Sequence, residues 1–180
     1  GSDINILVIG RVNAWKGQDL LVRALSFLSG SVSERAKVRF AGASFEGGGE
    51  FAELRSLVTR EGRSDRVSFD GFVDDPAELY RWADVVVVPS KKPEPFGLVA
   101  IEAMMHERPV IAADHGGLVE IVSHGKTGLR FTPNDAGALA RSIEIIVSDI
   151  EIAVSMGRAG RMLYEKQFSE DRFKDEIIDA

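Results

Sequence analysis

The chain has 180 residues, of which 44% are hydrophobic, so it can bury one full core and its length favours a single domain. It has no cysteine, which excludes disulfides and thiolate metal sites. A formal net charge of −6 argues against general nucleic-acid binding, because that activity requires a concentrated basic face. The apolar stretches are too short to span a membrane and no signal peptide precedes them, so we expect a cytoplasmic protein.

The chain begins with Gly1 and Ser2, which are typical of the remnant of a cleaved tag, and it enters an apolar strand at Ile4–Ile9 almost at once. This abrupt start predicts that residues 1–180 are one domain of a longer protein. After a loop, leucine and alanine recur at helical spacing and predict a helix over Gln18–Leu28.

Strands and helices then alternate along the chain. The next expected elements are a strand at Val38–Ala41, a helix at Phe51–Arg60, a strand at Val67–Phe69, a helix at Pro76–Trp82, a strand at Val85–Val88, a helix at Leu98–His106, a strand at Val110–Ala113, a short helix at Gly117–Val122 and a strand at Leu129–Phe131. From Asp135 onward the pattern indicates helices alone, at Asp135–Ser148, Ile152–Tyr164 and Ser169–Ile178. This order predicts an α/β fold, a doubly wound, Rossmann-like parallel sheet of about six strands with helices on both faces and a helical C-terminal extension.

In such a sheet, ligands bind beyond the carboxyl ends of the strands, near the point where the strand order reverses. The loops after the first and fourth strands are therefore the candidates. The first loop reads Gly10-Arg11-Val12-Asn13-Ala14-Trp15-Lys16-Gly17. Arg11 offers a planar fork for phosphate oxygens and Lys16 a compact point charge, so the pair could clamp a diphosphate. The alternative is that both are solvated surface cations.

The second loop reads Pro89-Ser90-Lys91-Lys92-Pro93-Glu94-Pro95-Phe96-Gly97-Leu98 and leads into a helix that contains Glu102. The first-turn amides of this helix lack partners within it and carry the positive end of its dipole, which makes a seat for an anion. Glu94 and Glu102 flank that seat, and carboxylates accept hydrogen bonds from sugar hydroxyls. The alternative is that Glu94 is a solvated loop acid and Glu102 a surface helix acid, although Glu102 has apolar neighbours in the sequence.

Three motifs in this chain together resemble the retaining GT-B glycosyltransferases of family 4, and the resemblance runs from Ile4 to about Phe173. The motifs are Gly10-Arg11 with Lys16-Gly17, the segment from Glu94 to Glu102 with seven residues between the two acids, and Gly116-Gly117-Leu118-Val119-Glu120-Ile121-Val122 with Gly125-Lys126-Thr127-Gly128. The chain is similar to the carboxy-terminal, donor-binding half of that fold. The resemblance implies a nucleotide-sugar-binding domain whose amino-terminal acceptor domain is absent.

The resemblance also implies a role for each matching residue. Arg11 and Lys16 would contact the donor diphosphate and stabilise the departing nucleotide, and Glu94 would hold hydroxyls of the transferred sugar. Glu102 would hold the ribose hydroxyls. The other residues expected at the donor are Gly10, Phe96, Gly97, Leu98 and Val99, together with Gly71, Phe72 and Val73, whose backbone would lie against the base. No cofactor and no metal are expected, and membrane contact would arise at most peripherally, through the missing domain.

Other polar residues receive more modest interpretations. Asp74 and Asp75 stand before Pro76 and indicate a helix-capping turn rather than a metal site. The glycine pair Gly116 and Gly117 predicts a tight turn near the donor. None of the three histidines is assigned a catalytic role.

Three other functions compete with donor binding for glycosyl transfer. An NAD-dependent oxidoreductase fits poorly, because the first loop lacks the G-x-G-x-x-G pattern that such domains need after the first strand. A non-catalytic nucleotide-binding module would keep the fold without the chemistry, and the presence of Arg11, Lys16, Glu94 and Glu102 disfavours it. A GT-B epimerase or phosphorylase is a closer alternative, and a test for transfer to an acceptor would separate it.

Overall fold

The computed structural model describes residues 1–44 and 48–169. Within these ranges six strands form one parallel sheet in the order β3-β2-β1-β4-β5-β6. The strands are β1 (Ile4–Ile9), β2 (Ala36–Ala41), β3 (Val67–Gly71), β4 (Val85–Val88), β5 (Val110–Ala113) and β6 (Gly128–Phe131). This is the doubly wound order, in which the strand sequence reverses between β1 and β4. The predicted fold class is confirmed.

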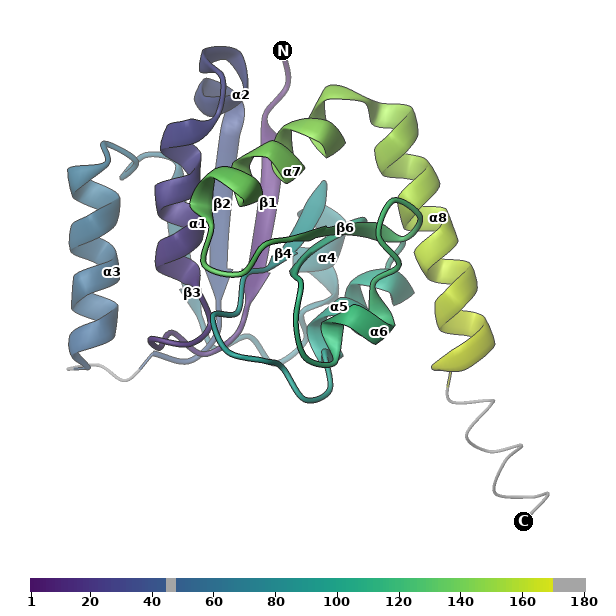
Figure 1. Cartoon of the computed structure of the whole chain (residues 1–180). Coiled ribbons are helices and arrows are strands. Elements are labelled where there is room, and N and C mark those ends of the chain that lie inside the picture. The colour runs from purple at the N-terminus through teal and green to yellow at the C-terminus, as the bar shows by residue number, and fades with distance from the viewer. Residues whose placement is uncertain (45–47, 170–180) are drawn as a thin grey trace.

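Helices cover both faces of the sheet (Figure 1). One face packs against α1 (Gln18–Ala24), α3 (Gly49–Arg60) and α7 (Ala136–Ser148), and α1 and α7 lie side by side over it. The opposite face packs against α4 (Ala77–Trp82), α5 (Leu98–Met105) and α6 (Leu118–Ile121). None of the helices in the described residues is long and apolar enough to cross a bilayer.

The central strands are buried on both faces, as their continuous apolar sequences predict. In β4, Val85 and Val87 enter the core beneath α1 and α7, whereas Val86 and Val88 enter the core beneath α5. All four valines are buried. The register of β4 places Val86 beside Leu7 of β1 and Val110 of β5, which sets the height at which the loop after β4 emerges.

The last described helix, α8 (Ile150–Gln167), connects the two helical layers. Ala153 and Met156 belong to the first core, whereas Tyr164 and Phe168 pack against the second. At Gly157 the helix lies so close to the chain after α5 that an added Cβ would stand 2.2 Å from the carbonyl oxygen of Glu107. The absence of a side chain at this position therefore allows α8 to pack on the end of α5.

Several element boundaries differ from the sequence-based expectation. The helix expected over Gln18–Leu28 ends at Ala24 and continues as a 3₁₀ turn over Leu25–Phe27. The carbonyl of Leu25 accepts hydrogen bonds from the Ser33 hydroxyl and the Arg63 guanidinium, so it is not available to prolong the helix. A further short helix, α2 (Gly30–Arg35), was not predicted at all.

At the C-terminal end, α8 begins two residues earlier than predicted. The carboxylate of Asp149 accepts hydrogen bonds from the amides of Glu151 and Ile152, which sets the first turn at Ile150. The helix also runs on to Gln167, three residues beyond the predicted end. The helix expected over Ser169–Ile178 lies outside the described residues, apart from Ser169 itself, which is not helical.

Gly17 provides a test of how tightly the first loop is packed. We expect Gly17→Ala to lower the free energy of unfolding by at least about 2 kcal/mol. Gly17 has a φ of 75°, which favours glycine, and an added Cβ would stand 2.0 Å from the carbonyl oxygen of Pro89. Urea unfolding measures the change. Gly30→Ala is the matched control, since Gly30 begins a helix in open space, and it should be neutral or slightly stabilising. Equal effects of the two substitutions would contradict the expected packing.

Candidate functional site

The loops that follow β1 and β4 lie against each other at the carboxyl edge of the sheet. The amide of Lys91 donates to the carbonyl of Trp15 at 2.7 Å, and the ammonium of Lys92 lies 4.7 Å from the centre of the Trp15 ring. A cavity of about 230 Å³ opens beside them. It is lined by Val8, Ile9, Lys16, Val88, Pro89, Ser90, Glu94, Pro95, Phe96, Gly97, Leu98 and Val99. The two loops nominated from the sequence therefore line one cavity.

An ion pair between Lys16 and Glu94 joins the two loops. The Lys16 ammonium donates to Oε1 of Glu94 at 2.6 Å, and the Ser90 hydroxyl donates to the same oxygen at 2.6 Å. Burial by itself would raise the pKa of Glu94. The hydrogen bonds from Lys16 and Ser90 outweigh it, so the pKa of Glu94 lies below its ordinary value. Glu94 is therefore a carboxylate at neutral pH.

The first loop is folded by its own polar side chains. The Oδ1 atom of Asn13 accepts hydrogen bonds from the amides of Trp15 and Lys16, which turns the chain toward Gly17. The side-chain amide of the buried Gln18 donates to the carbonyl of Arg11. These bonds place Lys16 in the cavity wall, whereas Arg11 is exposed and does not line the cavity.

Helix α5 begins at the cavity wall. Its N-cap residue, Gly97, has a left-handed conformation with a φ of 60°, and no side chain caps the first turn. The unpaired amides and the positive end of the helix dipole therefore remain open to a ligand. Phe96 and Leu98 are exposed at this edge of the sheet, as Trp15 and Phe72 are. The edge thus combines a mostly apolar cavity, in which Lys16, Ser90 and Glu94 are the polar side chains, with exposed apolar side chains.

The loop after β5 contacts the segment that contains Glu94. The amide of Gly117 donates to the carbonyl of Glu94 at 2.7 Å, so the glycine pair lies against the Glu94 segment. Nε2 of His115 lies 2.7 Å from the carbonyl oxygen of Ser90, and His115 contributes to the lowered pKa of Glu94. Sequence reasoning missed Ser90 and His115. The contact between them joins residues 25 positions apart, so no local pattern signals it.

Residues expected near the nucleotide lie at the same edge. The amide of Gly10 donates to the carbonyl of Ala41, and the carbonyl of Gly71 accepts from the amide of Gly42. Gly71 ends β3, Phe72 is exposed and Val73 packs against the second core. Asp75 accepts a hydrogen bond from the amide of Ala77, in keeping with the expected capping turn.

Glu102 lies on α5, one turn beyond Val99, and it does not line the cavity itself. Its Oε2 atom accepts a hydrogen bond from the hydroxyl of Tyr80 at 2.7 Å. The residue is partly buried rather than a fully solvated surface acid. Tyr80 belongs to α4, and sequence reasoning missed this partner of Glu102 as well.

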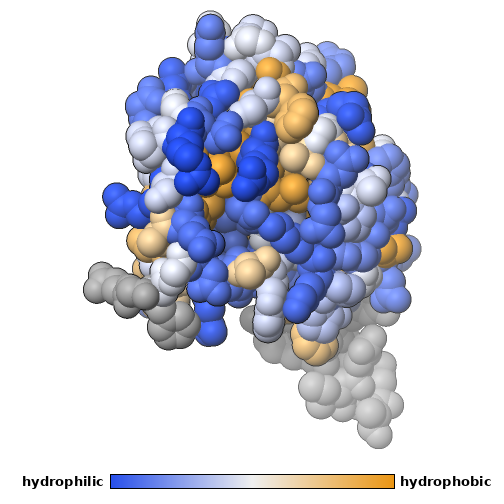
Figure 2. All heavy atoms as spheres, turned by 60° about the vertical axis from the view of Figure 1, so that its left-hand side comes forward, coloured by the Kyte–Doolittle hydropathy of each residue, from blue (hydrophilic) through white to orange (hydrophobic). Residues whose placement is uncertain are grey.

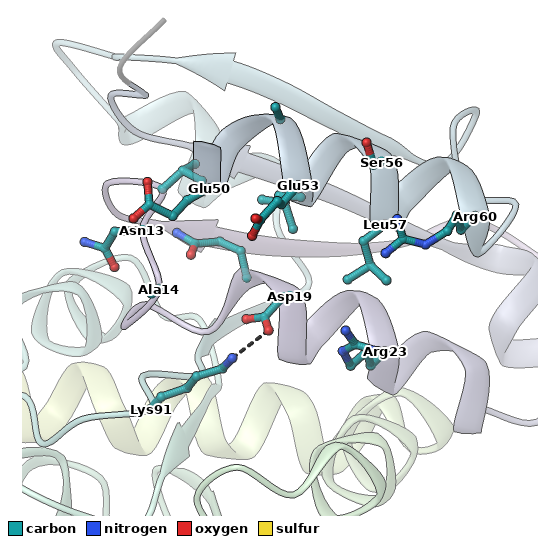
Figure 3. Close-up of a pocket in the computed structure, with 14 residues that line it drawn as sticks. Asn13, Ala14, Asp19, Arg23, Glu50, Glu53, Ser56, Leu57, Arg60 and Lys91 are labelled. Carbon is teal, nitrogen blue, oxygen red and sulfur yellow. Dashed lines mark hydrogen bonds and ion pairs between the residues drawn. The ribbon is translucent and has the colours of Figure 1, made fainter. Parts of the chain in front are cut away.

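A separate groove of about 540 Å³ runs between α1 and α3, on the outer side of the first loop (Figure 3). An ion pair between Asp19 and Lys91 lies in it at 2.6 Å, with Glu50 and Glu53 toward one end and Arg60 toward the other. This side of the molecule is mostly hydrophilic, with apolar side chains visible between the charged ones (Figure 2). None of the site residues nominated from the sequence lines the groove. In the described part of the chain, no group of three or more His, Asp or Glu side chains is arranged to hold a metal ion.

Comparison with known families decides the classification. The family model of the glycosyl transferases group 1 matches residues 1–162. The chain belongs to this family. It is 35% identical over 177 residues to the D-inositol 3-phosphate glycosyltransferase of Jonesia denitrificans, an alignment that covers 96% of the chain and 41% of that protein. It is 34% identical over 179 residues to an uncharacterised glycosyltransferase of Methanocaldococcus jannaschii, covering 97% of the chain and 44% of that protein. The chain thus spans less than half the length of these relatives.

Solved structures agree with this classification. The chain superimposes on Anabaena HepE in complex with UDP with a TM-score of 0.92 and 30% identity, covering 99% of this chain and 48% of that one. HepE has also been solved in complex with UDP-glucose. The C-terminal domain of a group 1 glycosyl transferase (LpcC) from Francisella tularensis matches with a TM-score of 0.81 and 26% identity, covering 94% of this chain and 88% of that domain. The predicted resemblance to the carboxy-terminal half of such enzymes is confirmed.

The ion pair at Glu94 predicts a specific pH dependence of stability. Because the folded-state pKa of Glu94 is lowered from about 4.5, its contribution is fully present above that value and is lost as the pH falls through the folded-state pKa. We expect wild-type protein to exceed Glu94→Gln in free energy of unfolding by about 1 kcal/mol at pH 7. Urea unfolding from pH 7 down to pH 3 should show this difference shrinking only below about pH 4.5.

The exposed Glu120 provides the control for this measurement. Glu120→Gln should leave the free energy of unfolding within about 0.5 kcal/mol of wild type at pH 7. A wild-type advantage over Glu94→Gln that grows as the pH falls would contradict the assigned sign.

Proposed function

We propose that this domain binds the nucleoside diphosphate sugar that serves as the donor in glycosyl transfer. The observation that carries the proposal is the meeting of Lys16, Glu94 and the open first turn of α5 at one cavity. The ammonium and the helix amides suit a diphosphate, and the carboxylate suits sugar hydroxyls. The complexes of the similar protein HepE with UDP and UDP-glucose support the same ligand class.

The proposed chemistry follows from where charge develops. As the glycosidic bond breaks, negative charge grows on the leaving diphosphate and positive charge on the sugar ring. Groups fixed beside the diphosphate therefore interact more strongly with the transition state than with the bound donor, and this difference accelerates the reaction. Lys16, Arg11 and the α5 amides would provide this stabilisation without a metal ion. From the family resemblance we also expect the configuration at the transferred sugar to be retained.

The ion pair between Lys16 and Glu94 is compatible with donor binding. An ammonium has three N–H donors, so Lys16 can keep its bond to Glu94 and still donate to a phosphate oxygen. Glu94 receives both observed hydrogen bonds on Oε1. Its second oxygen would accept from hydroxyls of the transferred sugar, close to the bond that breaks.

The remaining nominated residues complete the proposed donor site. Glu102 would accept hydrogen bonds from the ribose, and the segment from Gly71 to Val73 would lie against the base. Because the chain spans less than half of its relatives, we propose that an additional, amino-terminal domain holds the acceptor. Turnover would then require both domains.

The first test of the proposal is binding of a nucleoside diphosphate without metal. We expect calorimetric titration of the chain with UDP in excess EDTA to give a dissociation constant below about 1 mM. Lys16→Ala should weaken binding about 10-fold or more, because it removes a charged partner of the diphosphate. The control is Lys126→Ala, an exposed lysine just before the amino end of β6, which should bind as wild type does. Failure of UDP, GDP and ADP to bind folded protein up to millimolar concentration would contradict donor binding.

The second test separates the two carboxylates. We expect Glu94→Ala to weaken UDP-glucose more than UDP, because Glu94 is assigned to the transferred sugar. Glu102→Ala should weaken both ligands equally, because both contain the ribose. Each lost hydrogen bond should reduce affinity by about 3- to 10-fold. If Glu94→Ala reduces the affinities for UDP and UDP-glucose by the same factor, the assigned polarity of the donor is wrong.

A further inference from the structure

Tyr80 is a buried tyrosine on α4, beside the proposed donor site but outside its cavity. The side chain is fully buried in the second core, beneath α5. Its ring stacks on the imidazole of His106, with 4.8 Å between the ring centres and 10° between the planes. This packing holds the ring in one orientation, so the position of its hydroxyl is fixed.

The hydroxyl of Tyr80 donates its hydrogen bond to Oε2 of Glu102 at 2.7 Å. Burial, together with this bond and the adjacent negative charge, raises the pKa of Tyr80 far above its ordinary value. Tyr80 therefore remains protonated throughout the physiological range and is a permanent donor. A hydrogen bond from a neutral donor to a carboxylate is stronger than one between neutral groups.

The second oxygen of Glu102 is left without a partner. In residues 1–44 and 48–169 no other group donates to this carboxylate, and Oε1 is not among the buried atoms that lack partners. It therefore remains accessible at the surface. A partly buried carboxylate offers several acceptor positions and is stable when they are filled. Glu102 is thus held on one oxygen and open on the other.

Glu102 lies on α5 one turn beyond a residue that lines the donor cavity. Glu102 follows Val99 by three residues, so the two side chains share one face of the helix, and Val99 lines the cavity. Helix α4, which carries Tyr80, begins four residues after Val73. The same short segment of chain therefore supplies both the stretch proposed to contact the base and the hydroxyl that holds Glu102.

From these observations we infer that Tyr80 is a positioning residue, which orients the Glu102 carboxylate so that its free oxygen accepts hydrogen bonds from the ribose hydroxyls of the donor. The inference rests on the proposed function. Without Tyr80, the carboxylate would rotate among several side-chain conformers and would have to be ordered when the nucleotide binds. Tyr80 thus contributes to affinity for the ribose without contacting it.

The test uses Tyr80→Phe, which keeps the buried ring and its stacking on His106 but removes the hydroxyl. Calorimetry compares UDP, GDP and ADP with their 2′,3′-dideoxy counterparts, which lack the ribose hydroxyls. We expect the variant to bind the ribonucleotide about 3- to 10-fold more weakly than wild type. It should bind the dideoxy form within about twofold of wild type, because no ribose hydroxyl is then present to use the oriented carboxylate. Glu102→Gln combined with Tyr80→Phe should lose little more than Glu102→Gln alone.

Tyr164→Phe is the matched control, since Tyr164 is the other tyrosine of the chain and lies on α8, where its ring contacts the Arg161 guanidinium. It should bind both nucleotide forms as wild type does. Equal weakening of ribo and dideoxy forms by Tyr80→Phe, or no weakening of either, would overturn the positioning role. A wild-type protein that binds nucleotide without preferring the ribose would overturn it too, while nucleotide binding would stand. A wild-type protein that binds no nucleoside diphosphate would overturn the proposed function itself, and the positioning role with it.

Discussion

The position of β1 between β2 and β4 is the constraint on which the rest of the site depends. Strands β2 and β3 lie on one side of β1, and β4, β5 and β6 lie on the other side. The loops after the adjacent strands β1 and β4 therefore emerge as neighbours. Residues 78 positions apart in sequence, Lys16 and Glu94, consequently meet at 2.6 Å. The close fit of the first loop beneath Pro89 follows from the same adjacency.

Several charged side chains around this point have partners before any ligand arrives. Glu94 has Lys16 and Ser90, Lys91 has Asp19, and Glu102 has Tyr80. Such pairing reduces the cost of holding charges away from water and fixes the side chains in place. A diphosphate would then enter a site whose donors already point to the cavity, which lowers the entropy lost on binding.

Local sequence patterns predicted the strands and the two loops that line the cavity, because apolar periodicity and turn residues act over a few positions. They did not reveal Ser90, His115 or Tyr80, whose contacts depend on which loops and helices the fold brings together. Arg11 and Lys16 looked equivalent in sequence. The Lys16 amide donates to Oδ1 of Asn13 and the Gln18 side chain donates to the Arg11 carbonyl, and in the loop so folded only Lys16 lines the cavity. Helix α2 escaped prediction because six residues carry too little periodicity to distinguish a helix from a loop.

The path of α8 has a mechanical consequence for the domain. Because this helix contacts the cores on both sides of the sheet, it acts as a brace between the two helical layers. At Gly157 the backbone of α8 packs directly against the chain that follows α5. We therefore expect a displacement of one helical layer to be transmitted to the other through α8. The same contact would oppose sliding of α5 along its axis relative to β4.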